Sequence, residues 1–380
     1  MNVIKKELSV VIPCLNEEDT IEICIQKINK VFIEYKIEGE ILVVDNGCTD
    51  SSIDICKKYN VRVIKENKKG YGAALKTGIK NSIGKFILMA DADNSYDFLE
   101  IPKFLNKLRE SYDLVQGCRF SSGGGTIMKN AMPLSHRYFG NPFFSFLVRL
   151  LYKAPFKDVY CGMRAFKKSE FDQINHTSNG MEFAIENLLK FNSKKLKITE
   201  VPITLHRDGR KNTSSHLKTV SDGIKTLKLL LICSPKWIYF LPSILFFFMS
   251  IDNGFKIDFL TMDKQSIYKE ITISSIFLIL SMHIFITGIY AMTKAVHMGF
   301  ESKENYFLKI IYKIFNLKKI LYISVIGILF SIYQIYSNSF IFVDDNINTI
   351  IFYFIFCFFS ILTFNSLLVS FLEFDEVNDE

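Results

Sequence analysis

The sequence predicts an α/β domain with a mostly parallel sheet, followed by a C-terminal bundle of about four transmembrane helices. Three observations support this prediction. Residues 1 to about 230 mix charged, polar and apolar residues, and short apolar runs alternate there with helical patterns. Beyond that point the apolar runs become long and rich in Phe, Ile and Leu. Alternating strands and helices are typical of βαβ units, in which the strands run parallel.

Five apolar runs in the first part are expected to form strands, and four periodic segments are expected to form helices. The strands are predicted at Leu8–Ile12, Glu40–Asp45, Val61–Lys65, Phe86–Ala90 and Leu114–Gly117. The helices are predicted at 18–33, 51–59, 71–82 and 98–110. The strands predicted to end at Asp45 and Ala90 lead into short polar motifs. Ligands of open α/β sheets bind at the carboxyl ends of strands, so the residues of both motifs are candidates for a ligand-binding site.

Four later segments approach the roughly 20 apolar residues that a bilayer requires. They are 236–252, 271–293, 320–342 and 349–372. One such segment alone could be a buried core helix, but four together favour a membrane domain. The 294–319 loop carries six lysines, which places it in the cytoplasm. We therefore expect a multi-pass protein of a bacterial-type cytoplasmic (inner) membrane.

The expected domain limits follow from these patterns. Residues 1–212 form the cytoplasmic α/β domain and 236–372 the transmembrane domain, while the acidic tail 373–380 returns to the cytoplasm. Residues 213–235 lie between them, and 215–233 place apolar residues near one face of a helix. That pattern is typical of amphipathic helices in the membrane interface, although a surface helix packed on the α/β domain is an alternative.

Charge and cysteine content exclude several classes of function. The net charge of +7 is mild for this length, and no basic helix or aromatic stacking motif indicates nucleic-acid binding. The basic clusters at 207–211 and 309–319 flank apolar segments, which favours anionic lipid headgroups or a lipid phosphate as partners. The eight cysteines show no spacing typical of a zinc site, and we expect them to be reduced.

Three local motifs allow both a structural and a ligand-binding interpretation. The run from Pro13 to Glu18 could be an ordinary strand-to-helix turn with acidic residues at the helix start. The turn that begins at Asp45 could end with Asp50 as a helix N-cap. Gly70 and Gly72 could form a glycine-rich helix entry that either cradles a phosphate or only packs closely.

The pair Asp91 and Asp93 is more specific. Two carboxylates two residues apart, directly after an apolar strand, repel each other unless a cation lies between them. Mg²⁺ or Mn²⁺ takes such hard oxygen ligands and typically bridges carboxylates to substrate phosphates. A solvated loop is the alternative interpretation.

The order of the motifs resembles glycosyltransferase family 2, and more narrowly the polyprenyl-phosphate hexose synthases (the dolichol-phosphate glucose and mannose synthase group). The resemblance covers about residues 8–240. It rests on SVVIPCLNEE, VVDNGCTDSS, KGYGAALKTGI, MADADNSYDFLEIPKFL, HRYFGNPFFSFLVRLLY, CGMRAF, SNGMEF and EVPITLHRDGR. It implies a GT-A-type Rossmann-like domain that binds a nucleotide-sugar and a divalent metal.

The resemblance also implies roles for individual residues. Nucleotide-sugar binding would involve Pro13, Asn16, Glu17, Asp45, Lys69, Gly72 and Asp91. Asp93 would ligate the metal, and Arg119 and Arg164 would face donor or acceptor phosphate. Glu182, with Arg164, would lie near the acceptor, and Arg207 and Lys211 would bind its lipid phosphate. The chain departs from the commoner family pattern at Asn46 and Cys48, where Asp and Ser are usual, and at Ser95, where many members have Gln.

The implied reaction is inverting transfer of a hexose, with glucose favoured, to a polyprenyl phosphate such as undecaprenyl phosphate for cell-envelope glycan synthesis. A UDP-hexose donor is favoured over a GDP-hexose, and Asp91, Asp93, Arg119 and Arg164 would form the catalytic set. A transferase with a sugar-hydroxyl acceptor, in polysaccharide or lipopolysaccharide synthesis, is the alternative. A scaffold with an inactive transferase domain is a third hypothesis, which the intact carboxylate pair disfavours. Oligomeric state cannot be deduced from these patterns.

Overall fold

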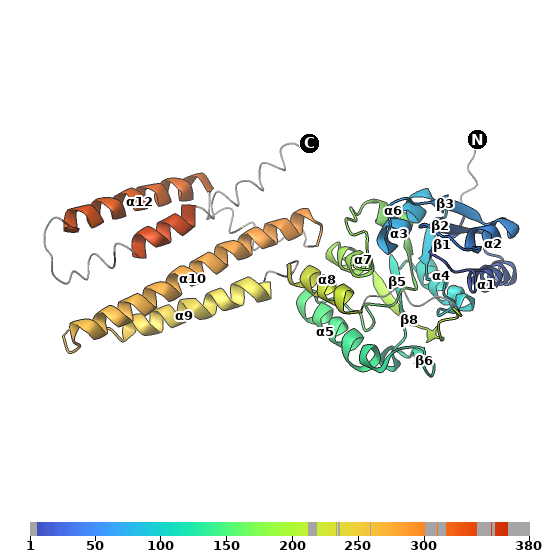
Figure 1. Cartoon of the computed structure of the whole chain (residues 1–380), viewed down its shortest axis with the longest axis horizontal. Coiled ribbons are helices and arrows are strands. Elements are labelled where there is room, and N and C mark those ends of the chain that lie inside the picture. Colours follow the sequence, from blue (N-terminus) through green and yellow to red (C-terminus); the bar gives the residue numbers. More distant parts are fainter. Residues whose placement is uncertain are drawn as a thin grey trace. The chain divides into compact units, whose positions relative to one another are not determined.

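The structure is a computed structural model whose described residues are 6–211, 219–232, 234, 236–258, 260–300, 310, 317–339, 351 and 354–363. The chain divides into two compact units, Met1–Leu230 and Leu231–Glu380, and each is described by itself (Figure 1). The acidic tail and the predicted loop at 343–348 lie outside the described residues, as does most of the 294–319 loop. The predicted domain limits and sidedness therefore stay predictions.

The first unit is built on a seven-stranded sheet with the strand order β3-β2-β1-β4-β7-β5-β8 (Figure 1). Its strands are β1 (Leu8–Cys14), β2 (Gly39–Asp45), β3 (Arg62–Lys65), β4 (Phe86–Met89), β5 (Leu114–Cys118), β7 (Arg164–Lys167) and β8 (Ile198–Pro202). All neighbours are parallel except β7, which runs antiparallel to both β4 and β5. A two-stranded sheet pairs β6 (Thr126–Ile127) with β9 (Thr204–Leu205). The mostly parallel α/β sheet is confirmed.

The helices of the first unit alternate with the strands along the chain. They are α1 (Ile21–Glu34), α2 (Ser52–Lys58), α3 (Tyr71–Asn81), α4 (Ile101–Arg109), α5 (Asn141–Tyr152), α6 (Lys168–Asp172), α7 (Phe183–Ser193) and α8 (Thr219–Ile232). Short helical turns are η1 (Phe98–Glu100), η2 (Ser121–Gly123) and η3 (His136–Gly140). The predicted helix 98–110 is divided into η1 and α4. Helix α8 lies within the predicted helical segment 215–233, and its interfacial position stays a prediction.

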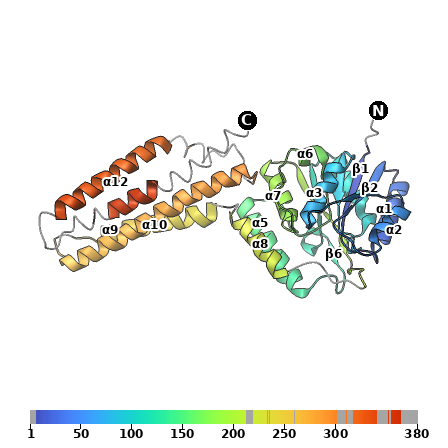
Figure 2. The ribbon, with the colours of Figure 1, turned by 45° about the horizontal axis from the view of Figure 1, so that its top comes forward.

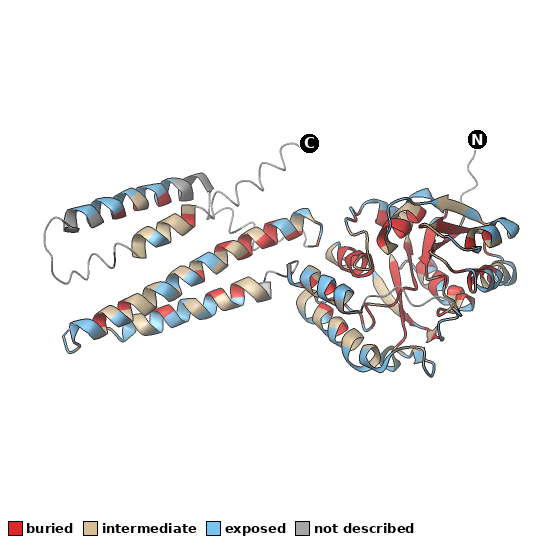
Figure 3. Ribbon diagram, in the orientation of Figure 1, coloured by how far each residue is buried: buried red, intermediate tan, exposed pale blue. Residues whose placement is uncertain are grey.

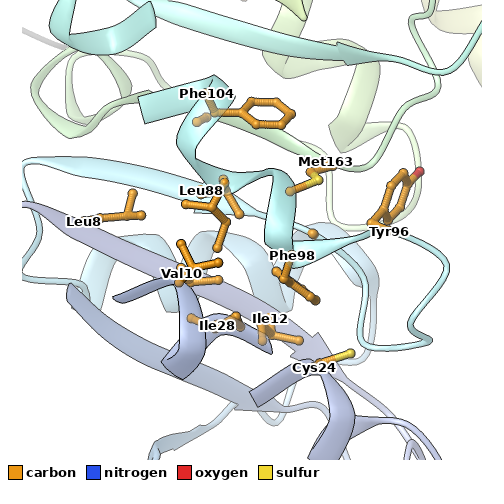
Figure 4. Close-up of a cluster of buried hydrophobic side chains, with 14 of the residues drawn as sticks. Leu8, Val10, Ile12, Cys24, Ile28, Leu88, Tyr96, Phe98, Phe104 and Met163 are labelled. Carbon is orange, nitrogen blue, oxygen red and sulfur yellow. The ribbon is translucent and has the colours of Figure 1, made fainter. Parts of the chain in front are cut away.

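Helices cover both faces of the large sheet. Side chains along each strand alternate between the two faces, so apolar residues on both faces need a helix to bury them. Leu8, Val10 and Ile12 of β1 point into a core shared with α1 and α4, and Figure 4 shows Ile28 and Phe104 in this cluster. On the opposite face, Gly78 of α3 lies against Val11 and Val44. The inner strands such as β1 and β4 are accordingly buried, whereas the edge strand β3 and the outward helix faces are more exposed (Figure 3).

The strand order creates a crevice at one end of the sheet. The chain runs from β1 outward through β2 to β3, and then returns across β1 to form β4 on its other side. The loops that follow β1 and β4, which are neighbouring parallel strands, therefore lie at the same end of the sheet, at the point where the strand order reverses. Such a topological switch point is where open α/β sheets bind ligands.

The second unit contains long apolar helices. They are α9 (Leu241–Phe255), preceded by the turn η4 (Lys236–Phe240), α10 (Lys264–His297) and α12 (Leu317–Ser339). Ser243 and Ser281 donate hydroxyl hydrogen bonds to each other's backbone carbonyls at 2.9 Å, which joins α9 to α10. Such close contacts of small residues are typical of helices that pack in a membrane.

Two stretches in the described part of the chain, 238–255 and 264–297, are long and apolar enough to cross a bilayer by length and composition. They coincide with the first two predicted spans. Shorter apolar helices cover 322–334 and 354–363, and the predicted spans 320–342 and 349–372 extend from these into residues outside the described ranges. The four-helix membrane bundle therefore stays a prediction.

We expect Gly78→Val to lower the free energy of unfolding of the first unit by about 2 kcal/mol, because overpacking a buried contact has a cost of this order. A Cβ atom at Gly78 would lie 2.5 Å from Val11 Cγ1 and 2.7 Å from Val44 Cγ2. Urea unfolding in detergent measures the effect. Gly223→Ala is the control, because its Cβ would meet nothing closer than 4.0 Å and alanine favours a helix. Equal stability of the two variants would contradict this packing.

Candidate functional site

A pocket of about 340 Å³ lies where β1, β2 and β4 end. Of the residues predicted to bind the donor, Pro13, Glu17, Lys69, Asp91 and Asp93 line it. Residues that were not predicted to bind a ligand also contribute to its wall: Cys14, Leu15, Asn46, Ala74, Ala92, Gly180, Met181, Arg210 and Lys225. Gly70 and Tyr71, from the glycine-rich motif, complete the wall. Both strand-end motifs thus contribute to one pocket, while their role as a functional site stays a prediction.

The loop after β1 is fixed to the loop after β2. Asn16 adopts a left-handed backbone conformation (φ 58°), and its Oδ1 accepts a hydrogen bond from Thr49 N at 2.8 Å. The amide of Glu17 donates to Ser52 Oγ at 2.7 Å. These bonds orient the Glu17 side chain into the pocket. Asn16 does not line the pocket and instead stabilises the loop through its hydrogen bond to Thr49.

Asp45 has a structural role in its own turn. Its Oδ1 accepts hydrogen bonds from the amides of Gly47 (2.9 Å) and Cys48 (2.8 Å). Burial acts to raise the pKa of Asp45, but these amides outweigh it and hold the pKa below its ordinary value. Asp45 is not among the residues that line the pocket, so its predicted contact with the nucleotide stays a prediction.

Asn46 explains one departure from the commoner family pattern. Its Nδ2 donates to the carbonyls of Glu66 (3.1 Å) and Lys68 (2.9 Å), and its Oδ1 accepts from Gly70 N (2.8 Å). An ionised aspartate could accept the third bond but could not donate the first two. Asn46 therefore ties the end of β2 to the turn that enters α3.

That turn requires glycine at two positions. Gly70 has φ +140°, and a Cβ there would lie 2.2 Å from Asn179 O. At Gly72 a Cβ would lie 2.6 Å from Phe183 Cβ and 2.9 Å from Ser178 O. The 178–183 segment thus packs directly on the start of α3, and the pocket wall includes both segments. Gly72 itself serves this close packing and does not line the pocket.

The Asp91–Asp93 pair carries an unsatisfied acceptor. Asp91 Oδ1 is buried and has no hydrogen-bond partner among the residues that the structure describes. Burial, reinforced by the neighbouring charge of Asp93, raises the pKa of Asp91 to about 7. Ser95, the residue that replaces the commoner Gln, donates to Asp93 Oδ1 from its amide (3.0 Å) and its hydroxyl (2.6 Å). Ser95 therefore orients Asp93.

These carboxylates fit a divalent cation that completes its coordination with a ligand. Hard oxygen donors and one unpartnered buried oxygen suit Mg²⁺ or Mn²⁺. Within the described residues, no three His, Cys, Asp or Glu side chains form a ready-made metal cluster. A cation held here would need oxygens from phosphate or water, which is the usual arrangement for Mg²⁺ at phosphate sites.

Arg210 is the main site residue that sequence reasoning missed. Its guanidinium donates to both carboxylate oxygens of Glu17, through Nε (2.9 Å) and Nη2, and Nη1 lies 3.7 Å from Asp93 Oδ2. The basic cluster 207–211 indicated that cationic side chains lie near the site, but the family resemblance implied a phosphate-binding role for Arg207 and Lys211 and not for Arg210. Both of these side chains are exposed, and neither lines the pocket.

The two other predicted arginines are committed to protein partners. Arg119 donates through Nε (2.7 Å) and Nη2 (2.8 Å) to Asp158, and both side chains are buried. Arg164 is fully buried and donates to the carbonyls of Ala184 and Cys161. Neither lines the pocket, so the structure gives them an anchoring role, and their predicted contact with phosphate stays a prediction.

Buried polar residues of α7 hold the 174–182 segment against the pocket. Glu186 accepts hydrogen bonds from the amides of Thr177 and Ser178, both at 2.8 Å, and pairs with Lys190 at 2.7 Å. Burial acts to raise the pKa of Glu186, but Lys190 and these amides outweigh it and lower the pKa to about 2. Glu182 does not line the pocket. It accepts a hydrogen bond from Gly180 N at 3.1 Å and so positions Gly180, which does line it.

The fold and the site together define an α/β domain whose pocket at the switch point brings three carboxylates and three basic side chains together. The chain belongs to glycosyl transferase family 2, whose model matches residues 9–198, half of the chain.

Curated relatives come from Haloferax volcanii. The chain is 35% identical over 237 residues to "Low-salt glycan biosynthesis hexosyltransferase Agl6", covering 62% of this chain and 55% of that protein. It is 30% identical over 197 residues to a "Dolichyl-phosphate hexose transferase", covering 52% of this chain and 82% of that protein. The match thus spans little more than half the length of Agl6.

Solved structures of similar fold include glucosyl-3-phosphoglycerate synthase from Mycobacterium tuberculosis in complex with Mn²⁺, UDP and glucosyl-3-phosphoglycerate. It covers 60% of this chain and 79% of its own, with 20% identity and a TM-score of 0.46. This likeness is too distant to assign a ligand to this chain.

We expect His176 to make the first unit less stable as the pH falls from 6.5 to 4. Its Nδ1 lies 3.0 Å from Ile174 O and its Nε2 lies 3.1 Å from Asn187 Nδ2, which together suit a neutral ring. Burial lowers the pKa of His176 from 6.5 to about 4. Between these values the unfolded chain binds a proton that the folded chain does not, so stability declines with falling pH.

Unfolding midpoints in urea, measured across this pH range, test the prediction. His176→Gln should be less stable than the wild type at pH 7 but should lose less additional stability on acidification. An unchanged slope in the variant would show that His176 does not titrate as its surroundings indicate.

Proposed function

We propose that the chain is an inverting glycosyltransferase that moves a hexose from a nucleoside-diphosphate sugar to a polyprenyl phosphate at the cytoplasmic membrane face. The observation that carries the proposal is the pocket at the switch point, where Asp91 and Asp93 lie beside the cationic Arg210. Family membership supports a sugar transfer. Glucose as the sugar, undecaprenyl phosphate as the acceptor and a role in cell-envelope glycan synthesis are the finer parts of this proposal.

The charges of the pocket suit a nucleoside diphosphate. Its lining contains three carboxylates, from Glu17, Asp91 and Asp93, and three basic side chains. The basic residues are Lys69, Arg210 and Lys225. These basic side chains can donate hydrogen bonds to diphosphate oxygens and neutralise their charge. We favour a UDP-sugar over a GDP-sugar as the donor.

In the proposed site, Asp93 ligates Mg²⁺ or Mn²⁺ while Asp91 orients the nucleotide. Ser95 keeps Asp93 in place for this task. When bound, the metal would offset the negative charge that develops on the leaving diphosphate. Arg210 and Lys69 are close enough to the same pocket to add to that electrostatic stabilisation.

A phosphate acceptor suits this site because it is already anionic at neutral pH and needs positioning more than a general base. The printed name of one relative, a dolichyl-phosphate hexose transferase, supports an acceptor of this class. Arg207, Lys211 and Glu182 remain candidates for acceptor contact. The first two are exposed and so accessible to a lipid phosphate.

An exposed apolar surface supports a membrane location. Helices α5 and α8 lie side by side (Figures 1 and 2), and Tyr152 Oη donates to Leu230 O at 2.8 Å between them. Along η3, α5 and α8, large apolar side chains face solvent, including Phe139 (76% exposed) and Ile224 (62% exposed). An interfacial position would bury this surface in the headgroup region.

The donor and acceptor are tested together with membranes that contain the full-length protein. We expect labelled UDP-glucose, undecaprenyl phosphate and Mg²⁺ to yield a labelled product that extracts into chloroform. A panel of UDP- and GDP-sugars identifies the donor. If no sugar labels lipid while a soluble glycan becomes labelled, the acceptor is a sugar hydroxyl and the proposal is wrong.

We expect Asp93→Asn to lower the rate of transfer at least about 100-fold, because it removes a charged metal ligand near the developing charge. Initial rates at saturating donor, with Mg²⁺ or Mn²⁺ varied, measure the loss. Asp54→Asn is the control, because Asp54 is exposed on α2, pairs with Lys57 at 3.0 Å and does not line the pocket. A fully active Asp93→Asn protein would exclude Asp93 as the metal ligand.

Gly70→Ala should weaken nucleotide binding at least about tenfold, because a Cβ at φ +140° would push the α3 entry away from Asn179. Gly124→Ala is the matched control: Gly124 also has a positive φ (+82°), but it does not line the pocket. Calorimetric titration with UDP and with GDP measures both variants. Similar affinities in the two variants would show that the glycine turn does not shape the nucleotide site.

A further inference from the structure

Arg210 has an unusual set of partners for a residue in a proposed diphosphate site. Its side chain is only 9% exposed, and three carboxylates surround it. Glu17 accepts two of its hydrogen bonds, Asp208 Oδ2 accepts one from Nη1 at 2.7 Å, and Asp93 Oδ2 lies 3.7 Å from the same Nη1. The guanidinium therefore already lies beside the carboxylate proposed to hold the metal.

The backbone keeps Arg210 in this position. His206 N donates to Ser95 O at 2.8 Å, and Gly209 N donates to Asp93 O at 2.9 Å. A Cβ at Gly209 would lie 2.9 Å from Thr20 Cγ2, so this approach is close. These hydrogen bonds hold the 206–210 segment along the loop that carries Asp91 and Asp93. They therefore fix the position of Arg210 beside that loop.

The charges indicate what this arrangement does in the absence of a ligand. Three carboxylates and three basic residues line the pocket, which makes it nearly neutral. A divalent cation that arrived alone would be attracted by Asp93 but repelled by the guanidinium beside it, which weakens its binding. A cation that arrives with a diphosphate brings its own compensating charge and offers the guanidinium new acceptors.

We propose that Arg210 is a positioning residue that serves as the resting counter-ion of Asp93 and competes with the divalent metal for it. This inference rests on the proposed function of the same pocket. Its consequence is that the metal binds strongly only together with the nucleoside diphosphate. By thermodynamic reciprocity, the metal strengthens nucleotide binding by the same factor. A divalent ion is thereby kept out of the empty site.

The experiment measures Mn²⁺ binding to the purified full-length protein in detergent, with free Mn²⁺ followed by electron paramagnetic resonance. Titrations are made without nucleotide, with UDP and with GDP. In the wild type we expect weak binding of Mn²⁺ alone and binding at least about tenfold tighter with one of the nucleotides. Arg210→Gln keeps a hydrogen-bond donor near Glu17 but removes the charge. It should bind Mn²⁺ alone about tenfold more tightly than the wild type does, and the gain from nucleotide should shrink.

Two further variants separate charge from structure. Arg210→Lys retains the charge and should keep weak binding of Mn²⁺ alone. Arg109→Gln also removes an arginine that binds a glutamate through two hydrogen bonds, here to Glu7 at 2.8 Å each, but away from the pocket. It should behave as the wild type. If Arg210→Gln binds Mn²⁺ alone no more tightly than the wild type, or if Arg210→Lys binds it as tightly as Arg210→Gln, the inference is overturned.

A last comparison distinguishes failure of the inference from failure of the proposed function. Asp93→Asn should abolish the nucleotide-dependent binding of Mn²⁺. If wild type and Asp93→Asn bind Mn²⁺ alike under all conditions, there is no metal site at Asp93, and both proposals fail. If binding depends on Asp93 but is insensitive to the charge of Arg210, the metal site stands and only the counter-ion role is excluded.

Urea unfolding checks that each variant is folded, and a protein with Arg210→Lys provides the comparison should Arg210→Gln fail to fold.

Discussion

The crowding of negative charge at the ends of β1 and β4 is the constraint on which this site depends. The strand order brings the loop of Glu17 and the loop of Asp91 and Asp93 to one crevice, because β1 and β4 are neighbours in the sheet. Like charges at such distances are stable only if a cation lies among them or if a proton is retained. The structure supplies the cation, since Arg210 pairs with Glu17, and burial beside Asp93 raises the pKa of Asp91, which favours its protonated form.

Much of the architecture around this constraint could be predicted from sequence. Alternation of apolar runs and helical patterns placed five strands within two residues of their observed limits, and the strand-end rule indicated where the site would be. Strands β7 and β8 were not predicted. The antiparallel insertion of β7 between β4 and β5 is a long-range pairing that no local pattern of residues can specify.

The side chains of the site were predicted less well, for physical reasons. Motifs identify which residues cluster in sequence, but Arg119 and Arg164 turn toward Asp158 and the backbone of α7, and only three-dimensional packing decides this. Arg210 was overlooked for the converse reason. Its partner Glu17 lies 193 residues away, so their pairing has no local signature. Asn46 and Ser95 looked like departures from the family pattern, and hydrogen bonding explains both.

The position of Arg210 along the chain has a consequence for what constitutes the minimal working unit. The family match ends at residue 198, which is before most of β8 and before the segment that carries Arg210. A fragment that stopped there would retain Glu17, Asp91 and Asp93 but would lack the guanidinium that balances them. The segment that the family model matches is thus shorter than the set of residues whose charges balance one another in this site, which extends at least to residue 210.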